Sequence, residues 1–285
     1  MRTHTLGLIL SATLTLLATH DAPADTLPST TVIDGIVETG LNRFLGEPIV
    51  DWGGELGTFG ANFLGEYDPS SDLPLPLTAA TPGYALLATN IDREFQEMMF
   101  GQPPETLDTS GENLPLREAF LQAGPSVFER AQVSGHADAQ PYTLSRSEPN
   151  TQISLDDWTA GEGRMRIRCR ADGTASLRVR FENLVPNGVY TLWHFYVGEA
   201  GPGVLPAGGV PNLFVPDADG DGRFVRELSY CPTGEDSPTL AYLLAYHVDG
   251  AAYGGFPDAP LEHLYGGVVT VEQLIFPVNV ASVLP

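Results

Sequence analysis

Apolar and polar positions alternate strictly in part of the second half of the chain. In RMRIRC (164–169) and SLRVRF (176–181), apolar side chains occupy every second position, and arginines occupy most of the positions between them. A period of two is typical of a strand with one buried face. The two segments therefore predict two half-buried strands.

The segment RADGTA (170–175) joins these strands, and its length decides which residues face each other. A two-residue loop at Asp172-Gly173 would place Ile167 opposite Arg178 and mix the two faces. A three-residue loop ending at Gly173 instead pairs Ile167 with Leu177 and keeps both faces uniform. We therefore predict the three-residue loop, with Gly173 in the left-handed conformation of a bulged hairpin.

Further apolar runs predict more strands, at 153–158, 188–197, 223–230, 239–248 and 267–276. The runs at 188–197 and 239–248 are apolar on both faces, which favours central positions in a sheet. Because no helical pattern separates the strands, residues 151–285 are expected to form an antiparallel Greek-key β-sandwich of about seven to eight strands.

Residues 25–150 have a different pattern. Apolar residues recur at helical intervals from Ile33 to Leu45, interrupted by Gly35 and Gly40, and short helices are expected at 90–100 and 115–124. Much of the remainder is rich in turn-forming residues. The chain is thus expected to be mainly β, with a partly helical, loop-rich and acidic N-terminal region.

The first residues have the pattern of a secretory signal. One arginine precedes a short apolar stretch, and small residues lead to Asp25, so residues 1–24 are interpreted as a signal peptide. The apolar stretch is too short to span a bilayer, and we expect no membrane span. These features predict a secreted or periplasmic protein.

The charge of the chain is strongly negative. The net charge is −22, and all 14 basic residues are arginine. This charge argues against a nucleic-acid partner and against anionic membranes. The two cysteines, Cys169 and Cys231, suit an oxidising compartment, where one disulfide between them is expected. Free thiols or an intermolecular bond are the alternatives.

The segment DADGDG (217–222) resembles the first half of a calcium-binding loop. Asp217, Asp219 and Asp221 alternate, and Gly222 follows at the turn position. The twelfth position is Leu228, however, where such loops carry a bidentate glutamate. A solvated polar turn between strands is the interpretation that we favour, with calcium as the possible cofactor.

Three histidines and an aromatic loop supply two further candidate sites. A transition metal could be bound by His194, His247 and His263, although their spacing matches no metal motif; interior hydrogen bonding is the alternative. The loop at 246–267 could bind a glycan, or its rings could fill the end of the sandwich. Its candidate ligand-binding residues are Tyr246, Asp249, Tyr253, Phe256, Asp258 and Tyr265.

Support for catalysis in the sequence is weak. The chain has no Gly-x-Ser-x-Gly motif, and Asp156 and Asp157 would point to opposite faces of the strand expected at 153–158. We therefore expect no catalytic residue and no cofactor beyond calcium.

The arginines of the predicted hairpin all lie on one face. Like charges that oppose each other across strands are destabilising. Residues 25–150 hold 19 acidic and five basic side chains, so we expect this region to pack across the arginines. A solvated arginine ladder is the alternative. The arginines concerned are Arg164, Arg166, Arg168, Arg170, Arg178 and Arg180.

The segments FENLVPNGVYTLWHFYV, DADGDGRFV and AYHVDGAAYGG occur in this order. Together they resemble a group of uncharacterised secreted bacterial β-sandwich proteins that carry an L-x-P-x-x-x-Y-T-L-W strand. The resemblance covers about residues 150–280 and implies an exported sandwich, but it assigns no catalytic residue. The sequence thus predicts a secreted or periplasmic, non-catalytic binding or surface-associated protein. A metal-dependent enzyme and a carbohydrate-binding module are the alternatives.

Overall fold

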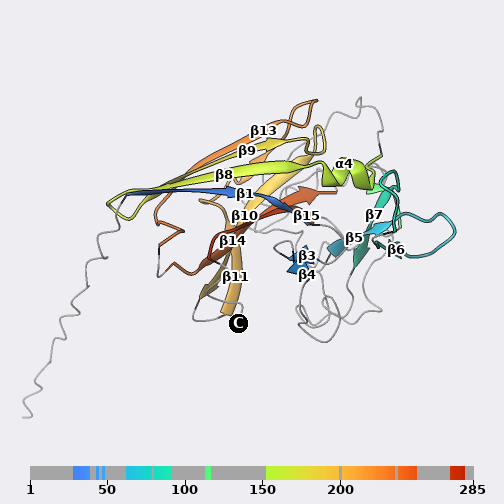
Figure 1. The fold of residues 1–285 in the computed structure, drawn as a ribbon, viewed down its shortest axis with the longest axis horizontal. Helices are drawn as coiled ribbons and strands as arrows, with labels where there is room; N and C mark the ends of the chain where they lie inside the picture. The colour runs from blue at the N-terminus through green and yellow to red at the C-terminus, as the bar shows by residue number, and fades with distance from the viewer. Residues whose placement is uncertain are drawn as a thin grey trace, which may run out of the picture.

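The computed structural model describes residues 28–38, 43–44, 47–48, 62–78, 80–91, 113–116, 152–198, 201–234, 237–248 and 270–279. Two antiparallel sheets face each other in this part of the chain (Figure 1). The expected mainly β fold is therefore confirmed. Apart from short pieces at their ends, the helices expected at 90–100 and 115–124 lie outside the described residues.

The first sheet, here called sheet A, has four strands. In spatial order they are β1 (Ser29–Asp34), β8 (Glu162–Cys169), β9 (Ala175–Glu182) and β13 (Gly222–Leu228). The hairpin of β8 and β9 has the predicted register, because Ile167 lies opposite Leu177 and Arg166 opposite Arg178. Gly173 has a φ of 79°, so the predicted three-residue turn is confirmed as well.

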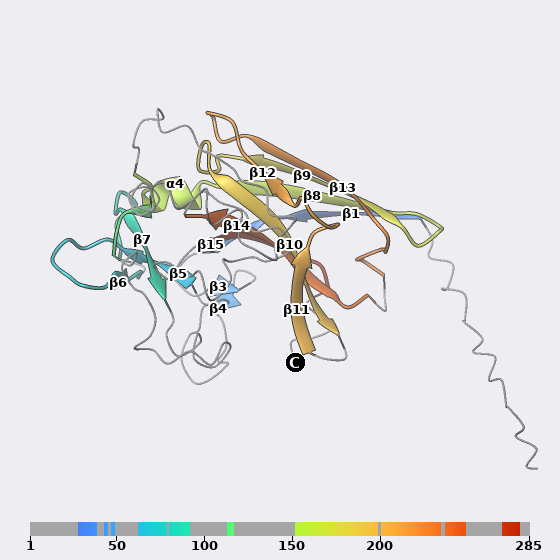
Figure 2. The same ribbon diagram turned by 180° about the vertical axis from the view of Figure 1, so that it is seen from behind.

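The second sheet, sheet B, packs beneath sheet A. Its strands in spatial order are β11 (Gly201–Pro206), β10 (Val189–Gly198), β14 (Thr239–His247), β15 (Thr270–Pro277) and β2 (Ile36–Val37), and β12 (Leu213–Phe214) also pairs with β10 (Figure 2). The central positions predicted for the two most apolar strands, β10 and β14, are confirmed. The strand order does not by itself establish a Greek key, which stays a prediction.

The main core lies between the two sheets. Sheet A contributes the apolar face of its alternating strands, and sheet B contributes large aromatic and aliphatic side chains such as Tyr190, Tyr242 and Phe276. A second apolar cluster, which includes Trp193 and Ile275, lies on the opposite face of sheet B. The central strands of sheet B, β10 and β14, are thus buried on both faces, whereas the outer face of sheet A is exposed.

The helical spacing from Ile33 to Leu45 indicated a helix, and this is wrong for the described residues, which are in strands except for Gly35 and Glu38. β1 pairs with β8 in sheet A, and β2 pairs with β15 in sheet B, so the chain crosses from one sheet to the other at Gly35. A Cβ at Gly35 would lie 3.0 Å from the Phe276 ring, and the Gly35 N–H donates to the Gly163 carbonyl. Pairing with distant strands outweighs the local helical spacing.

The strand predicted at 153–158 is also wrong. These residues lead into the short helix α4 (Leu155–Thr159), which buries Leu155 and Trp158. Ser154 caps the helix: its hydroxyl accepts from the Asp157 N–H, and the Asp157 carboxylate accepts from the Ser154 N–H. This capping box is visible in the sequence and would have indicated a helix start.

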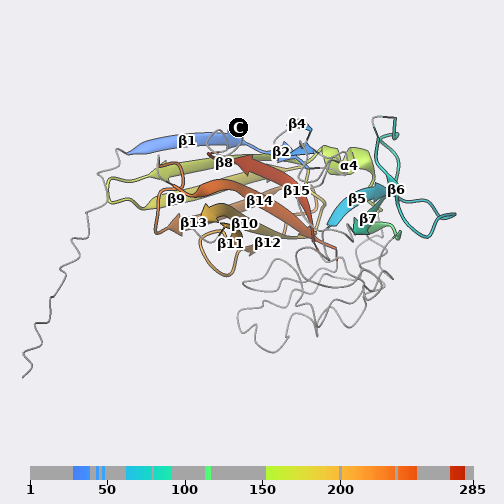
Figure 3. The same ribbon diagram turned by 90° about the horizontal axis from the view of Figure 1, so that it is seen from below.

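The remaining described strands of the N-terminal region are short. They form a pair, β3 (Arg43–Phe44) and β4 (Glu47–Pro48), and a three-stranded sheet of β6 (Leu75–Pro76), β5 (Asn62–Glu66) and β7 (Leu87–Ile91). The three-stranded sheet lies beside α4 at one end of the sandwich (Figure 3). Of the helices in the described part of the chain, none has the length and apolar character needed to cross a membrane.

Candidate functional site

The outer face of sheet A carries a group of exposed arginines. Strand alternation directs the apolar residues of β8 and β9 into the core, so their arginines point outward. β13 adds one more, because Arg223 lies opposite Arg180. We call this surface the arginine face and define it by six exposed side chains: Arg164, Arg166, Arg168, Arg178, Arg180 and Arg223.

The strand registers order the outer face of sheet A into three rows that run across β1, β8, β9 and β13. Row one is Asp34, Arg164, Arg180 and Arg223; row two is Val32, Arg166, Arg178 and Val225; row three is Thr30, Arg168, Ser176 and Glu227. Sequence reasoning missed the contributions of Val32, Val225 and Arg223. The alternation in RFVREL (223–228) predicted a strand, but only the fold places that strand beside β9.

Carboxylates surround the arginine face but neutralise little of it. At one end, Glu162 lies opposite Glu182, and Arg164 Nε is 3.6 Å from Asp34 Oδ1. At the other end, Glu227 pairs with Arg170, which lies outside the face as defined. The five other arginines of the face form no ion pair with a residue that the structure describes.

The acidic N-terminal region was expected to cover these arginines. Among its described parts, only β1 borders the face, where it contributes Asp34. The sheet of β5, β6 and β7 lies at the end of the sandwich instead (Figure 3). Much of the region from 25 to 150 lies outside the described residues, and for those residues the covering stays a prediction.

His194 lies in the interior of the sandwich. It extends from β10 toward sheet A, with Nε2 2.8 Å from the Thr239 hydroxyl and Nδ1 3.0 Å from the Tyr230 hydroxyl. Burial lowers the pKa of His194 to about 4. Burial therefore keeps the imidazole neutral near pH 7, and both ring nitrogens are in hydrogen-bond contact with hydroxyls.

His247 lies on the opposite face of sheet B from His194. Its Nε2 is 2.7 Å from the Thr191 hydroxyl, which also accepts from the Trp193 indole N–H. Burial lowers the pKa of His247 to about 3.

The structure does not bring these two histidines together. His247 is opposite Val189, five positions along β10 from His194, which corresponds to roughly 17 Å. His263, the third proposed ligand, lies outside the described residues. Nowhere in the described ranges do three or more potential metal-binding side chains form a group.

The three aspartates before β13 lie in a compact exposed turn. The Asp217 carboxylate accepts from the N–H groups of Asp219 and Asp221, both at 3.0 Å. Gly220 has a φ of 82°, and a Cβ there would lie 2.4 Å from the Leu184 carbonyl oxygen. These contacts are those of an Asx turn, in which the Asp217 carboxylate accepts hydrogen bonds from backbone N–H groups of the turn.

The proposed glycan-binding loop is only partly described. Tyr246 is buried, with its ring centre 5.3 Å from that of Tyr190 and 5.9 Å from that of Trp158. It is therefore a core residue, and its proposed role in contacting a sugar is wrong. The other candidates in this loop lie outside the described residues: Asp249, Tyr253, Phe256, Asp258 and Tyr265.

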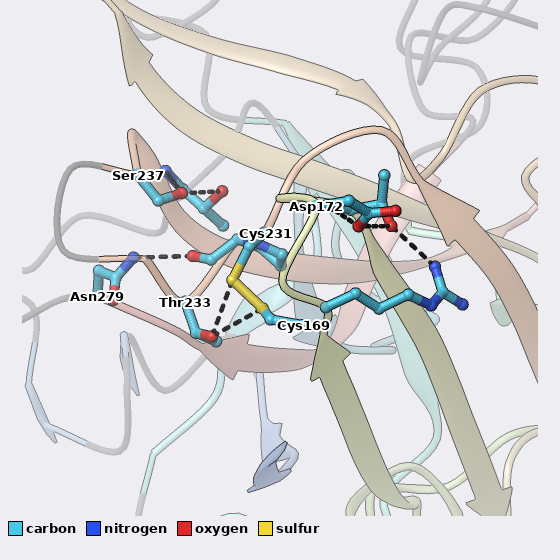
Figure 4. The surroundings of a disulfide bond; sticks show 10 residues. Cys169, Asp172, Cys231, Thr233, Ser237 and Asn279 are labelled. Carbon is cyan, nitrogen blue, oxygen red and sulfur yellow. Dashed lines mark hydrogen bonds between the residues drawn. A yellow bond between two sulfur atoms is a disulfide. The ribbon is translucent and has the colours of Figure 1, made fainter. Parts of the chain in front are cut away.

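The predicted disulfide between Cys169 and Cys231 is confirmed, with 5.3 Å between the Cα atoms (Figure 4). It joins the end of β8 to the segment that follows β13. The Thr233 hydroxyl lies 3.4 Å and 3.5 Å from the two sulfur atoms. The crosslink thus anchors the hairpin that carries most of the arginine face.

The described part of the chain is thus a β-sandwich whose sheet A carries an exposed cationic outer face. No protein-family model, curated protein or solved structure matches the chain. The resemblance to secreted bacterial β-sandwich proteins therefore stays a prediction.

Proposed function

We propose that this chain is an exported binding protein that holds an anionic ligand on the arginine face. One observation carries the proposal: five exposed arginines have no ion pair with a described residue, although the whole chain has a net charge of −22. Carboxylates are abundant in the chain, yet among the described residues few lie where they would neutralise this surface.

The arrangement of the arginines supports a ligand. Arg164 lies opposite Arg180, and Arg166 lies opposite Arg178, so like charges face each other in adjacent rows. Each such pair costs a few tenths of a kcal/mol or more. An anion between the guanidinium groups removes this repulsion and accepts paired, charge-assisted hydrogen bonds from them.

The scaffold beneath the face also supports binding. The inward side chains of β8 and β9 are buried in the main core, and the disulfide fixes one end of their hairpin. A sheet held in this way keeps the guanidinium groups near fixed positions, which lowers the conformational cost of binding.

Export is the second part of the proposal. The signal pattern at 1–24 supports it, and so does the disulfide, because such bonds persist in oxidising compartments. A binding role is favoured over a catalytic one because His194 and His247, the two described histidines considered as metal ligands, are buried within sheet B.

Retention on a carboxymethyl resin at neutral pH and low ionic strength tests the anion-binding role. A uniformly acidic protein flows through such a resin, whereas the arginine face should retain this one until salt is added. The double variant Arg166→Ser/Arg178→Ser should elute at clearly lower salt.

The matched control is Arg170→Ser/Arg226→Ser, which removes the same charge from the turn after β8 and from β13 but leaves the arginine face intact. Arg170 already pairs with Glu227, and the Arg226 guanidinium lies over the Phe224 ring. This variant should elute with the wild type. Flow-through of the wild type, or equal elution of both variants, would contradict the proposal.

A further inference from the structure

We propose that the ligand of the arginine face is an acidic polysaccharide, a chain of uronic-acid sugars lying along row two. This inference rests on the proposed function and adds the chemical class of the ligand. It is carried by the composition of row two, by the carboxylates around the face and by the geometry of the guanidinium groups.

Row two combines charge with exposed apolar surface. Arg166 and Arg178 occupy its centre, and Val32 and Val225 flank them with 48% and 38% of their surfaces exposed. Neighbouring strands lie about 4.8 Å apart, so the row offers apolar, cationic, cationic and apolar contacts at that spacing. A uronic-acid sugar carries a carboxylate and an apolar ring face in one unit, and a chain of them presents both kinds of group repeatedly.

The surrounding carboxylates limit how far an anionic ligand can extend along the strands. Successive rows are about 6.8 Å apart, so the three rows extend over about 14 Å along the strands. Glu162 and Glu182 stand beyond row one, and Glu227 ends row three. A densely charged polyanion that ran past these rows would meet like charges, whereas a thin chain with one charge per sugar can lie across the strands within row two.

The guanidinium groups favour carboxylates in this setting. An arginine side chain presents a planar fork of N–H donors that matches a carboxylate with two parallel hydrogen bonds. The arginines of rows one and three lie on both sides of row two, where they add attraction without requiring direct contact. Lysine would supply the same charge but not the fork, and the chain contains none.

Isothermal titration of the full exported protein with a hexamer of galacturonic acid tests the inference. The comparison ligands are the neutral galactose hexamer and an inorganic polyphosphate with the same number of charges. We expect the uronic-acid hexamer to bind with one-to-one stoichiometry and the neutral hexamer not to bind.

Two variants test the role of row two. Arg178→Lys should weaken uronate binding about tenfold, because it keeps the charge but loses the two-bond fork. Val225→Ser should weaken uronate binding about threefold and leave polyphosphate binding unchanged, because only the sugar uses the apolar contact. The matched control is Val204→Ser on β11, an equally exposed valine of sheet B that should have no effect.

The outcomes separate the inference from the proposed function. Binding of polyphosphate without binding of the uronate would overturn the inference and leave the anion-binding role standing. Binding of neither would overturn both. Equal losses for both ligands in Val225→Ser, with an unchanged melting temperature, would also contradict the apolar contact in row two.

Discussion

Arg166 on β8 lies directly opposite Arg178 on β9, and both side chains are exposed on the outer face of sheet A. Neither forms an ion pair with a described residue. The unliganded protein therefore carries a repulsion that a substitution can remove. A substitution in the arginine face should therefore change the free energy of unfolding as well as the binding of anions.

The first prediction is that Arg178→Thr stabilises the protein while it weakens anion binding. Removing one of two opposed charges should raise the free energy of unfolding by a few tenths of a kcal/mol, because threonine also suits a strand. Urea unfolding measures this gain. The control is Arg168→Thr, since Arg168 faces Ser176 and Thr30 and opposes no arginine. Equal effects of the two substitutions would argue against repulsion between Arg166 and Arg178.

The second prediction concerns the disulfide. Cys169 and Cys231 are 62 positions apart, so the crosslink restricts a long loop in the unfolded chain. The variant Cys169→Ala/Cys231→Ala should lose about 4 kcal/mol of stability in the chain-entropy model. Urea unfolding under non-reducing conditions gives the value. Thr233→Val, which keeps the crosslink and alters only the contact with the sulfurs, should lose far less.

The third prediction is that the protein loses stability as the pH falls below 6.5. Burial lowers the pKa of His194 to about 4 and that of His247 to about 3, from the ordinary value of 6.5. Between pH 6.5 and these values, the two histidines bind protons in the unfolded chain but not in the folded protein. The free energy of unfolding therefore decreases as the pH decreases. Each histidine contributes at most about 1.4 kcal/mol per pH unit.

Urea unfolding at a series of pH values between 6.5 and 4 measures this slope. His194→Gln removes one titrating group while keeping a polar side chain next to Thr239 and Tyr230, so its slope should be shallower than that of the wild type. Parallel slopes for the two proteins would show that His194 does not cause the acid sensitivity.

The fourth prediction is that the aspartates of the turn before β13 contribute unequally to stability. Asp217→Ala should lower stability by about 1 kcal/mol, because its carboxylate accepts two backbone N–H groups. Asp219→Ala should change stability by less than about 0.5 kcal/mol, because this exposed side chain is not needed for the turn. Millimolar calcium, compared with a chelator, should shift the melting temperature only slightly. A large calcium-dependent rise that Asp219→Ala abolishes would instead establish a calcium site.

Local features of the sequence determined the hairpin of β8 and β9. Its alternation has the period of a strand, and only one loop length keeps Ile167 opposite Leu177. The sequence alone therefore predicted both the strand register and the left-handed conformation of Gly173. The disulfide also followed, because only two cysteines were present to pair. Central positions for β10 and β14 followed from apolar residues on both faces.

Long-range pairing decided what the sequence alone did not. The residues around Gly35 have helical spacing, yet they form β1 and β2 because β8 and β15 offer them edges to pair with. Arg223 belongs to the arginine face only because β13 lies beside β9. Tyr246 does not belong to the candidate glycan site, because β14 directs its side chain into the core. Turns and alternation depend on neighbouring residues, whereas strand neighbours and burial depend on contacts between distant segments, which a local pattern does not contain.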